Sequence, residues 1–435
     1  MKLPKSITEW LGFLCIASVF VDMAIRRVLP FDFYFYYPVF ILFLISLFVT
    51  KGHIVLPPYW FTIGFGIICL ASLHKLLQTG TLGFEYLKQI FGILFTAIVY
   101  YNVLYIFRFN IKRIFEFYLK MAYWVALFGV FDNILHIAGI HITKPHGSGF
   151  MYREYSIMGE PFYLALALTP ALAYYIAFFQ RTWRERKTDF IVMLICYLIT
   201  YSSIAVAGLA LSVMFSLYIN DFFDVRKNRL VLVPILLLPL ILLINFLIDN
   251  VELINARFYD TTQLFLSTEL QTDKAGEANS STFALYSNYI IARDAFLNDP
   301  LFGSGLGSHP LIYKITFLEY FPSEYLERYG SQNQQDANSK FLRLMSETGL
   351  VGLGLFMFAF IRFFAARRNM RSKELRELGA INYAIFIYIT LCLIRNGNYI
   401  NVGFFLFFFI YYVSWKVIRY KPTPVTTLKP IFQAQ

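Results

Sequence analysis

The stretch 188–220, TDFIVMLICYLITYSSIAVAGLALSVMFSLYIN, decides how the whole chain is arranged. A helix needs roughly 20 mainly apolar residues to cross the hydrocarbon core of a bilayer, so this run is too long for one span. The polar residues Tyr201, Ser202 and Ser203 lie near its middle. We therefore expect two short helices or a re-entrant pair, and this division sets the side of the membrane on which every later segment lies.

Apolar runs continue on both sides of this stretch, from Leu11 to Ile418. The 435 residues are 58% hydrophobic and 15% charged, far more apolar than an average soluble chain. Since hydrocarbon offers no partners to backbone polar groups, α-helices suit these runs better than a barrel of short alternating strands. We expect an all-α polytopic membrane protein with about 12 transmembrane helices. The expected spans are residues 9–25, 31–50, 54–73, 88–107, 115–140, 159–180, 188–201, 203–220, 230–248, 347–366, 379–394 and 399–418.

The charge distribution predicts the orientation of these spans. A net charge of +11 would suggest nucleic acid as the partner of a soluble chain, but about 23 of the 38 Lys and Arg residues fall in short segments expected on one side of the membrane. Basic connections mark the cytoplasmic side, so both termini should be cytoplasmic and no nucleic-acid partner is expected. The expected parts are a first bundle of about nine helices, a large extracytoplasmic loop, the last membrane helices and a cytoplasmic tail, at 1–248, 249–346, 347–418 and 419–435.

Arginines on the outer side are the informative charged residues. A guanidinium keeps its charge and grips phosphate oxygens with paired hydrogen bonds, so several together would suit a polyprenyl pyrophosphate or another anionic head group. The alternative is that each pairs with an acid or extends toward lipid head groups. The arginines expected at or near the outer face are Arg153, Arg257, Arg293, Arg343 and Arg395.

Two polar segments frame possible chemistry around these arginines. Glu160 precedes Pro161 at an expected helix start, where a carboxylate is favoured by the positive helix end, although a catalytic role stays open. In the large loop, residues 281–297 have nearly helical periodicity. The glycines that follow, Gly303 and Gly305, resemble a dinucleotide-binding loop only superficially because no strand precedes them, but they let backbone amides approach a phosphate or sugar.

The loop ends with QQDANSKFLRLMSETGLVGLGLFMF, residues 334–358. Asp336 or Asn338 would cap the helix that enters the membrane there. The six histidines show no spacing typical of metal ligands, so no metal site is expected.

The order of these motifs resembles the O-antigen polymerase and ligase superfamily, of the Wzy and WaaL types. Arg153 with Glu160 before a span, Arg293 followed by PLFGSGLGS, and NSKFLRLMSETGLVG carry the resemblance. It covers most of the chain as topology and residues about 290–352 as sequence motif. The resemblance implies a GT-C-like membrane glycosyltransferase of the bacterial inner membrane that needs no metal or cofactor. It further implies that Arg293 and Arg153 bind the undecaprenyl pyrophosphate of a lipid-linked glycan and stabilise it as the leaving group.

One departure from the ligase pattern favours a polymerase. The ligases that this region resembles have a His-Asn pair followed by Gly-x-x-Gly. In this chain Asn338 and Ser339 stand at the place of that pair, before Gly349 and Gly352, so the histidine is absent. A polymerase would join lipid-linked repeat units of O-antigen, capsule or exopolysaccharide, with a chain-length regulator as a candidate partner. The alternatives are a ligase that transfers glycan to lipid A-core and a lipid-linked sugar flippase, which would carry ionisable residues or broken helices at the bilayer midplane.

The expected site residues divide by role. An asparagine cannot act as a general base, so any base that activates the acceptor hydroxyl has to be another residue. The candidate bases are Asp336, Asp294 and Glu160. The expected substrate-binding residues are Arg153, Arg293, Arg257, Gly303, Gly305 and Asn338.

Overall fold

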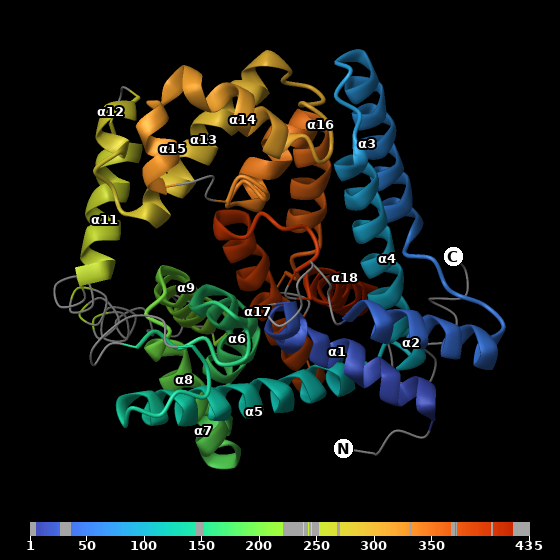
Figure 1. Ribbon diagram of the computed structural model, residues 1–435. Coiled ribbons are helices and arrows are strands. Elements are labelled where there is room, and N and C mark those ends of the chain that lie inside the picture. The colour runs from blue at the N-terminus through green and yellow to red at the C-terminus, as the bar shows by residue number, and fades with distance from the viewer. Residues whose placement is uncertain are drawn as a thin grey trace, which may run out of the picture.

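The structure is a computed structural model that describes residues 6–26, 36–144, 152–220, 238, 242, 245, 252–267, 270–329, 333–366, 370, 372–401 and 403–420. Within these residues the fold is entirely helical, which confirms the expected class (Figure 1). The helices are α1 Ile7–Arg26, α2 Tyr36–Lys51, α3 Tyr59–Gln78, α4 Phe84–Ile106, α5 Ile111–Ile137, α6 Pro161–Ala177, α7 Phe179–Glu185, α8 Lys187–Ile199, α9 Ser203–Ile219, α11 Glu252–Phe265, α12 Thr272–Ala275, α13 Ser280–Asn298, α14 His309–Tyr320, α15 Ser323–Tyr329, α16 Lys340–Arg362, α17 Lys373–Arg395 and α18 Phe404–Tyr420.

The apolar run 188–220 divides as expected, because α8 ends at Ile199 and α9 begins at Ser203. Helix α3 begins later than predicted because Pro57 and Pro58 disfavour helical conformation in the residues before them. Helix α16 begins at Lys340 rather than residue 347, so seven residues of the expected loop belong to it. Most of the expected span 230–248, and the expected tail beyond Tyr420, lie outside the described residues.

The helices identify a multi-pass membrane protein. Among the described residues, α3, α4, α5, α16 and α17 are long and apolar enough to cross a bilayer. Helices α6 and α7 together meet the same criterion, but they meet at a bend of 98°. Shorter apolar helices are Ile7–Val21, α2 and α9. The number of about 12 spans therefore stays a prediction.

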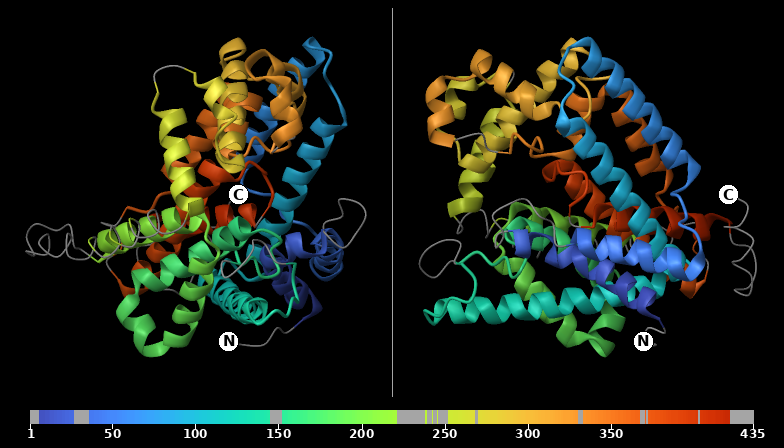
Figure 2. Two further views of the ribbon diagram at one scale, coloured as in Figure 1. Left: turned by 60° about the vertical axis from the view of Figure 1, so that its left-hand side comes forward. Right: turned by 45° about the vertical axis from the view of Figure 1, so that its right-hand side comes forward.

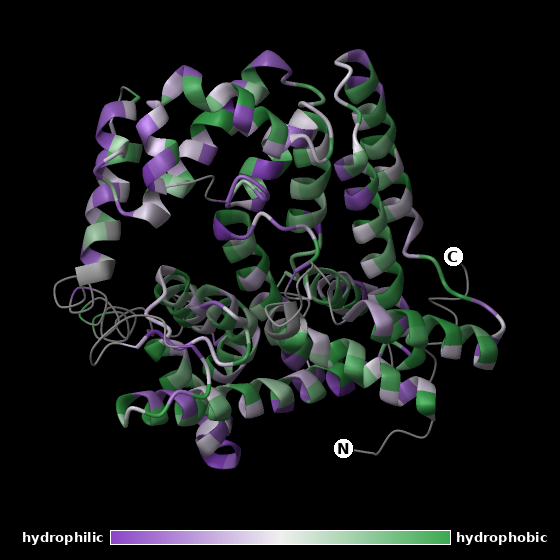
Figure 3. Cartoon of the chain, in the orientation of Figure 1, coloured by the Kyte–Doolittle hydropathy of each residue, from purple (hydrophilic) through white to green (hydrophobic). Residues whose placement is uncertain are grey.

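The large loop is a helical unit with its own core. In both views of Figure 2, as in Figure 1, helices α11 to α15 gather on one side of the molecule, and Figure 3 shows that they are more hydrophilic than the helices below them. Phe283 and Tyr286 of α13 pack against Tyr313 and Phe317 of α14 and Tyr329 of α15. Helix α13, predicted at 281–297, spans Ser280–Asn298 and joins this unit to α16.

A kink in α16 is where the loop meets the membrane helices. Gly349 has φ 57° and ψ −156°, a conformation available essentially to glycine alone. The segment 299–305 supplies the hydrogen bonds that the kink removes from the helix. Leu350 N donates to the Pro300 carbonyl at 2.8 Å, and Gly305 N donates to the Glu347 carbonyl at 2.9 Å. The glycines therefore allow two backbone segments to approach closely. The expectation that Gly303 and Gly305 bring backbone amides to a phosphate or sugar is wrong, because the amides pair with other parts of the backbone.

His309 is a second connection between α13 and α16. Its Nε2 donates to Asn288 Oδ1 at 2.9 Å, and its Nδ1 lies within hydrogen-bond distance of Ser346 Oγ, at 3.0 Å. Burial, helped by the charge of Arg343, lowers the pKa of His309 to about 3.

We expect Gly303→Ala to destabilise the protein by at least about 2 kcal/mol. Gly303 has φ +64°, and a Cβ atom there would lie 2.6 Å from the Ser346 carbonyl oxygen. Thermal unfolding of the protein in detergent measures the loss. The matched control is Gly354→Ala, since nothing lies within 4 Å of the added Cβ. Equal melting temperatures for the two variants would show that the loop does not dock at the kink.

Acidification should destabilise the fold through His309. In the unfolded chain this histidine binds a proton near pH 6.5, whereas in the folded chain it stays neutral until about pH 3. The free energy of unfolding therefore falls as the pH falls between these values. The loss should reach about 2 kcal/mol at pH 5. The measurement is the melting temperature from pH 8 to pH 5, and His309→Gln should flatten its pH dependence. The exposed His53 gives the control, His53→Gln; if both variants keep the wild-type slope, His309 is not the group responsible.

Candidate functional site

The turn before α16 brings polar residues from distant segments together. Ser339, not Asp336 or Asn338, is the N-cap, because its Oγ accepts from Leu342 N at 3.2 Å. The same hydroxyl donates to the Leu393 carbonyl at 2.6 Å and so fixes the turn to the end of α17. A Cβ atom on Gly397 would lie 1.4 Å from the Asp336 carbonyl oxygen. Only glycine permits this approach of the two backbones.

Buried charges follow on the first turns of α16. Arg343 is 2% exposed, and its Nε donates to Glu347 Oε1 at 3.1 Å. Tyr399 donates its hydroxyl to the other oxygen of Glu347 at 2.9 Å, and its ring lies 4.4 Å from the Arg343 guanidinium. Burial, together with the Glu347 carboxylate, raises the pKa of Tyr399 well above its ordinary value, so the hydroxyl remains a donor. Lys340 donates to the Asn398 carbonyl and lies 4.2 Å from the centre of the Phe404 ring.

Charges from other segments extend this group. Arg395, at the end of α17, lies within electrostatic range of Arg153, Glu160 and Asp336. Burial lowers the pKa of Arg153, while Glu160 acts in the opposite direction. Burial also raises the pKa of Asp336, and the neighbouring Arg343, Lys340 and Arg395 oppose that rise. Cations therefore outnumber acids around the Asp336 turn.

Hydrogen-bond donors in this group lack acceptors. Arg153 Nε, Arg343 Nη2 and Asn338 Nδ2 are buried and find no hydrogen-bond partner within the described residues. Asn338 Oδ1 is already used, since it accepts from Asn333 Nδ2 at 2.9 Å. A buried donor without an acceptor is unfavourable by about 1–3 kcal/mol, and more when it is charged. The group is therefore suited to a ligand that brings acceptor oxygens and negative charge, as a phosphate does.

An apolar groove begins at this charged group. It lies between α3, α16 and α18, encloses about 720 Å³, and is lined largely by aromatic side chains such as Trp60, Phe356 and Phe408. Lys340 and Tyr399 line it and also belong to the charged group, whereas Arg362 lies at the other end of α16. Only 11% of the most apolar part of α3 is buried, against 50% of that part of α16. Helix α3 thus lines one side of the groove while most of its apolar length stays exposed.

The expected bases lie in different places. Asp336 and Glu160 both lie near Arg395, and Glu160 is exposed. Asp294 accepts from the Tyr320 hydroxyl at 2.8 Å and from Asn298 Nδ2 at 3.1 Å on the face of α13. No hydrogen bond or ion pair joins it to the Arg395 group within the described part of the chain. The structure therefore favours Glu160 and Asp336 over Asp294 as groups near the unsatisfied donors.

The other expected ligands are placed less directly. Arg293 is exposed on α13 near Tyr286 and Tyr320, one residue after Ala292, which packs against Ala337 of the Asp336 turn. The side chain of Arg257, on α11, lies outside the described residues. The amides of Gly303 and Gly305 donate to the carbonyls of Asp299 and Glu347, so they are not open to a ligand.

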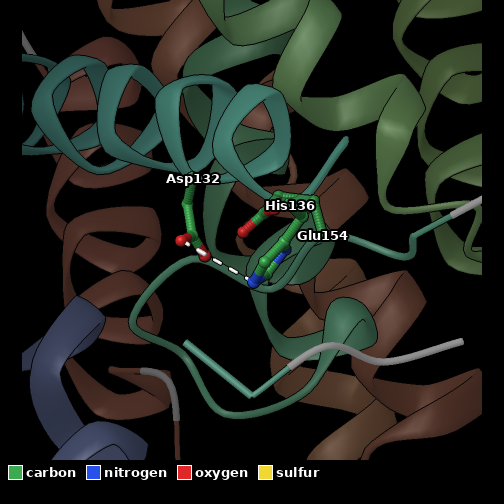
Figure 4. A group of neighbouring side chains, drawn as sticks. All are labelled: Asp132, His136 and Glu154. Atoms are coloured by element: carbon green, nitrogen blue, oxygen red, sulfur yellow. Dashed lines mark ion pairs between the residues drawn. The ribbon is translucent and has the colours of Figure 1, made fainter. Parts of the chain in front are cut away.

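Sequence reasoning missed Lys340, Glu347 and Tyr399 as parts of the site. The signal was present in the spacing of residues 340, 343 and 347, which places three charged side chains on one face of an apolar helix. It also missed a separate buried group, Asp132, His136 and Glu154, whose donor types suit a metal (Figure 4). Asp132 and His136 are one helical turn apart, but nothing in the sequence places Glu154 beside them.

The comparison with known families agrees with this geometry. Residues 190–357 match a protein family described as O-antigen ligase. The matched region extends from α8 through the loop helices to α16, and so contains the kink and the turn before α16. No curated protein matches the chain. The family acts broadly as membrane glycosyltransferases in O-antigen-related polysaccharide synthesis. The chain thus carries an O-antigen ligase-like domain at residues 190–357, which supports its place in the O-antigen polymerase and ligase superfamily.

Proposed function

We propose that this protein is a polysaccharide polymerase that joins undecaprenyl-pyrophosphate-linked repeat units on the periplasmic side of the bacterial inner membrane. The observation that carries the proposal is the set of buried, unsatisfied donors on Arg153, Arg343 and Asn338 beside an apolar groove. A diphosphate would supply the missing acceptors, and a polyprenyl chain suits an aromatic groove bordered by a largely exposed apolar helix. Lys340 lies where the two parts of such a substrate would meet.

The proposed reaction breaks the bond between the anomeric carbon of the donor glycan and its pyrophosphate oxygen. Negative charge then develops on the departing diphosphate, and a hydroxyl of the acceptor unit forms the new glycosidic bond. Arginine and asparagine donors that are already oriented stabilise that charge without rearrangement, an effect worth about 10²–10³ in rate for a single donor in other enzymes. Arg293, exposed on α13 next to the Asp336 turn, is a further candidate contact to the diphosphate.

The acceptor hydroxyl has to lose its proton during the transfer, and Glu160 is our first candidate base. Glu160 is an exposed residue near Arg153 and Arg395, where a sugar arriving from outside the fold can reach it. Asp336 is the second candidate, but Asn338 N already donates to its Oδ1 at 3.1 Å. The cations around Asp336 suit a residue that orients the arginines.

The ligase remains the second candidate function because the matched family is described as O-antigen ligase. The polymerase is preferred because Asn338 and Ser339 stand where the ligase pattern has a His-Asn pair. The two reactions share a donor and differ in the acceptor, which is a lipid-linked glycan for the polymerase and lipid A-core for the ligase. Deletion in the native host followed by glycan electrophoresis distinguishes them. Loss of the long-chain ladder with one repeat retained supports the polymerase, and loss of every attached repeat supports the ligase.

In the deletion strain, Arg153→Ala should restore chain synthesis at least about tenfold less well than the wild type, because one phosphate contact is lost. Arg343→Lys should be similarly impaired, since lysine keeps the charge beside Glu347 but not the second donor. The matched control is Lys314→Ala, which removes an exposed cation of α14. Band intensities are compared at equal protein levels. If Arg153→Ala and Arg293→Ala both give a full ladder, the pyrophosphate assignment is wrong.

The groove is tested by a pair of glycines on α3. Nothing lies within 4 Å of an added Cβ at Gly64 or Gly66, but only Gly64 is among the groove-lining residues. We expect Gly64→Leu to fill part of the groove and weaken chain synthesis several-fold, while Gly66→Leu leaves it unchanged. Both variants should reach wild-type levels in the membrane. Equal activity of the two variants would argue against a lipid tail in the groove.

A further inference from the structure

A buried group of side chains lies at the C-terminal end of α5, apart from the charged group around Asp336. Asp132 and His136 share a face of α5 because they are four residues apart. Glu154 comes from the connection to α6, and its backbone N donates to the Ile199 carbonyl at the end of α8 at 3.0 Å. The three side chains point toward one another, and their potential ligand atoms lie within 4.8 Å (Figure 4). All three are at most 3% exposed.

Each carboxylate accepts a hydrogen bond through one oxygen, while its other oxygen has no hydrogen-bond partner among the described residues. Thr143 donates its hydroxyl to Asp132 Oδ2, and Ser156 N donates to Glu154 Oε1 at 2.5 Å. Asp132 Oδ1 and Glu154 Oε2 are buried and accept no hydrogen bond within the described residues. Two buried carboxylate oxygens side by side are strongly unfavourable unless a positive charge lies between them.

We propose that Asp132, His136 and Glu154 bind a divalent transition-metal ion of the Zn²⁺ type. A donor set with one imidazole and two carboxylates suits Zn²⁺, whereas Mg²⁺ and Ca²⁺ prefer oxygen alone. The carboxylates balance the two positive charges of the ion. His136 Nε2 lies 3.8 Å from Asp132 Oδ1, so modest closure of the group would bring both atoms to one ion.

A fourth donor is already beside the imidazole. His136 Nε2 donates a hydrogen bond to the Thr143 carbonyl oxygen at 2.9 Å, and once that proton is displaced both atoms can bind the same ion. In the metal-bound form Nε2 contributes its lone pair and the ring carries its proton on Nδ1. The hydrogen bonds from Thr143 and Ser156 to the outer carboxylate oxygens have the role that second-shell contacts have at known metal sites, because they fix the direction of each ligand.

The ion would join α5 to the connection that carries Arg153. Thr143 and Glu154 both belong to the connection between α5 and α6, so one ion would fix two points of it. The packing here is close, since a Cβ atom on Gly129 of α5 would lie 3.3 Å from Glu154 Cγ. This is a positioning site and does not depend on the proposed glycosyl transfer. The competing explanation is a proton shared between the two carboxylates, which would satisfy the same oxygens.

The test uses the full chain purified in detergent, stripped with EDTA and exposed to Zn²⁺. After desalting, mass spectrometry should find about one Zn²⁺ per chain. Zn²⁺ should raise the melting temperature by about 5 °C, and Mg²⁺ should not. Asp132→Asn and Glu154→Gln keep the side-chain shape and should lose both effects, while His53→Gln, which removes an exposed histidine, should keep them.

The outcomes separate the metal from its alternatives. Failure of the wild type to retain Zn²⁺ overturns the proposal in favour of the shared proton. Equal uptake by the wild type and both carboxamide variants, or loss of uptake in His53→Gln, assigns the ion to another place and overturns it too. If a variant does not fold, X-ray absorption of the wild-type complex decides. One imidazole with oxygen ligands supports the site, and sulfur or several imidazoles exclude it.

Discussion

The backbone hydrogen bonds between the kink at Gly349 and the segment 299–305 are the contacts on which the rest of this architecture depends. A helix that bends sharply leaves amides and carbonyls unpaired, and in a membrane protein these groups have no water to turn to. Here the segment 299–305 pairs with them, so the break in α16 and the docking of the loop are one event. Gly303 and Gly349 make it possible because side chains at either position would separate the two backbones.

The kink also separates two chemical environments along one helix. Before it, Lys340, Arg343 and Glu347 are buried in protein and held by Tyr399 and the α17–α18 connection. After it, α16 contributes apolar side chains such as Phe356 to the groove. An amphiphile could therefore place a negatively charged head group near the buried cations and a long apolar tail in the groove beside them. The largely exposed helix α3 borders the part of the groove that would hold the tail.

The sequence predicts the helical class, the division of 188–220 and helix α13 well, because these rest on local composition and periodicity. The start of α16 was predicted seven residues late, since a hydropathy pattern excludes Lys340, Arg343 and Glu347 from a helix that buries them in protein. The arginines of the site could be expected from topology, whereas Tyr399 and His309 could not. Their roles depend on contacts across 52 and 37 residues of chain, with Glu347 and Ser346. The packing role of Gly303 and Gly305 was missed because a glycine signals close approach without saying what approaches.

The low burial of α3 affects the route by which a ligand could enter the groove. Most of the apolar part of α3 is not buried, so a lipid tail bound in the groove, as proposed, would enter it from the bilayer rather than from water. Such a substrate would arrive by diffusion within a two-dimensional leaflet, where local concentrations are high and its apolar tail never leaves hydrocarbon. Under the proposed function, turnover would then be linked to the abundance and mobility of lipids around the protein as much as to its own chemistry.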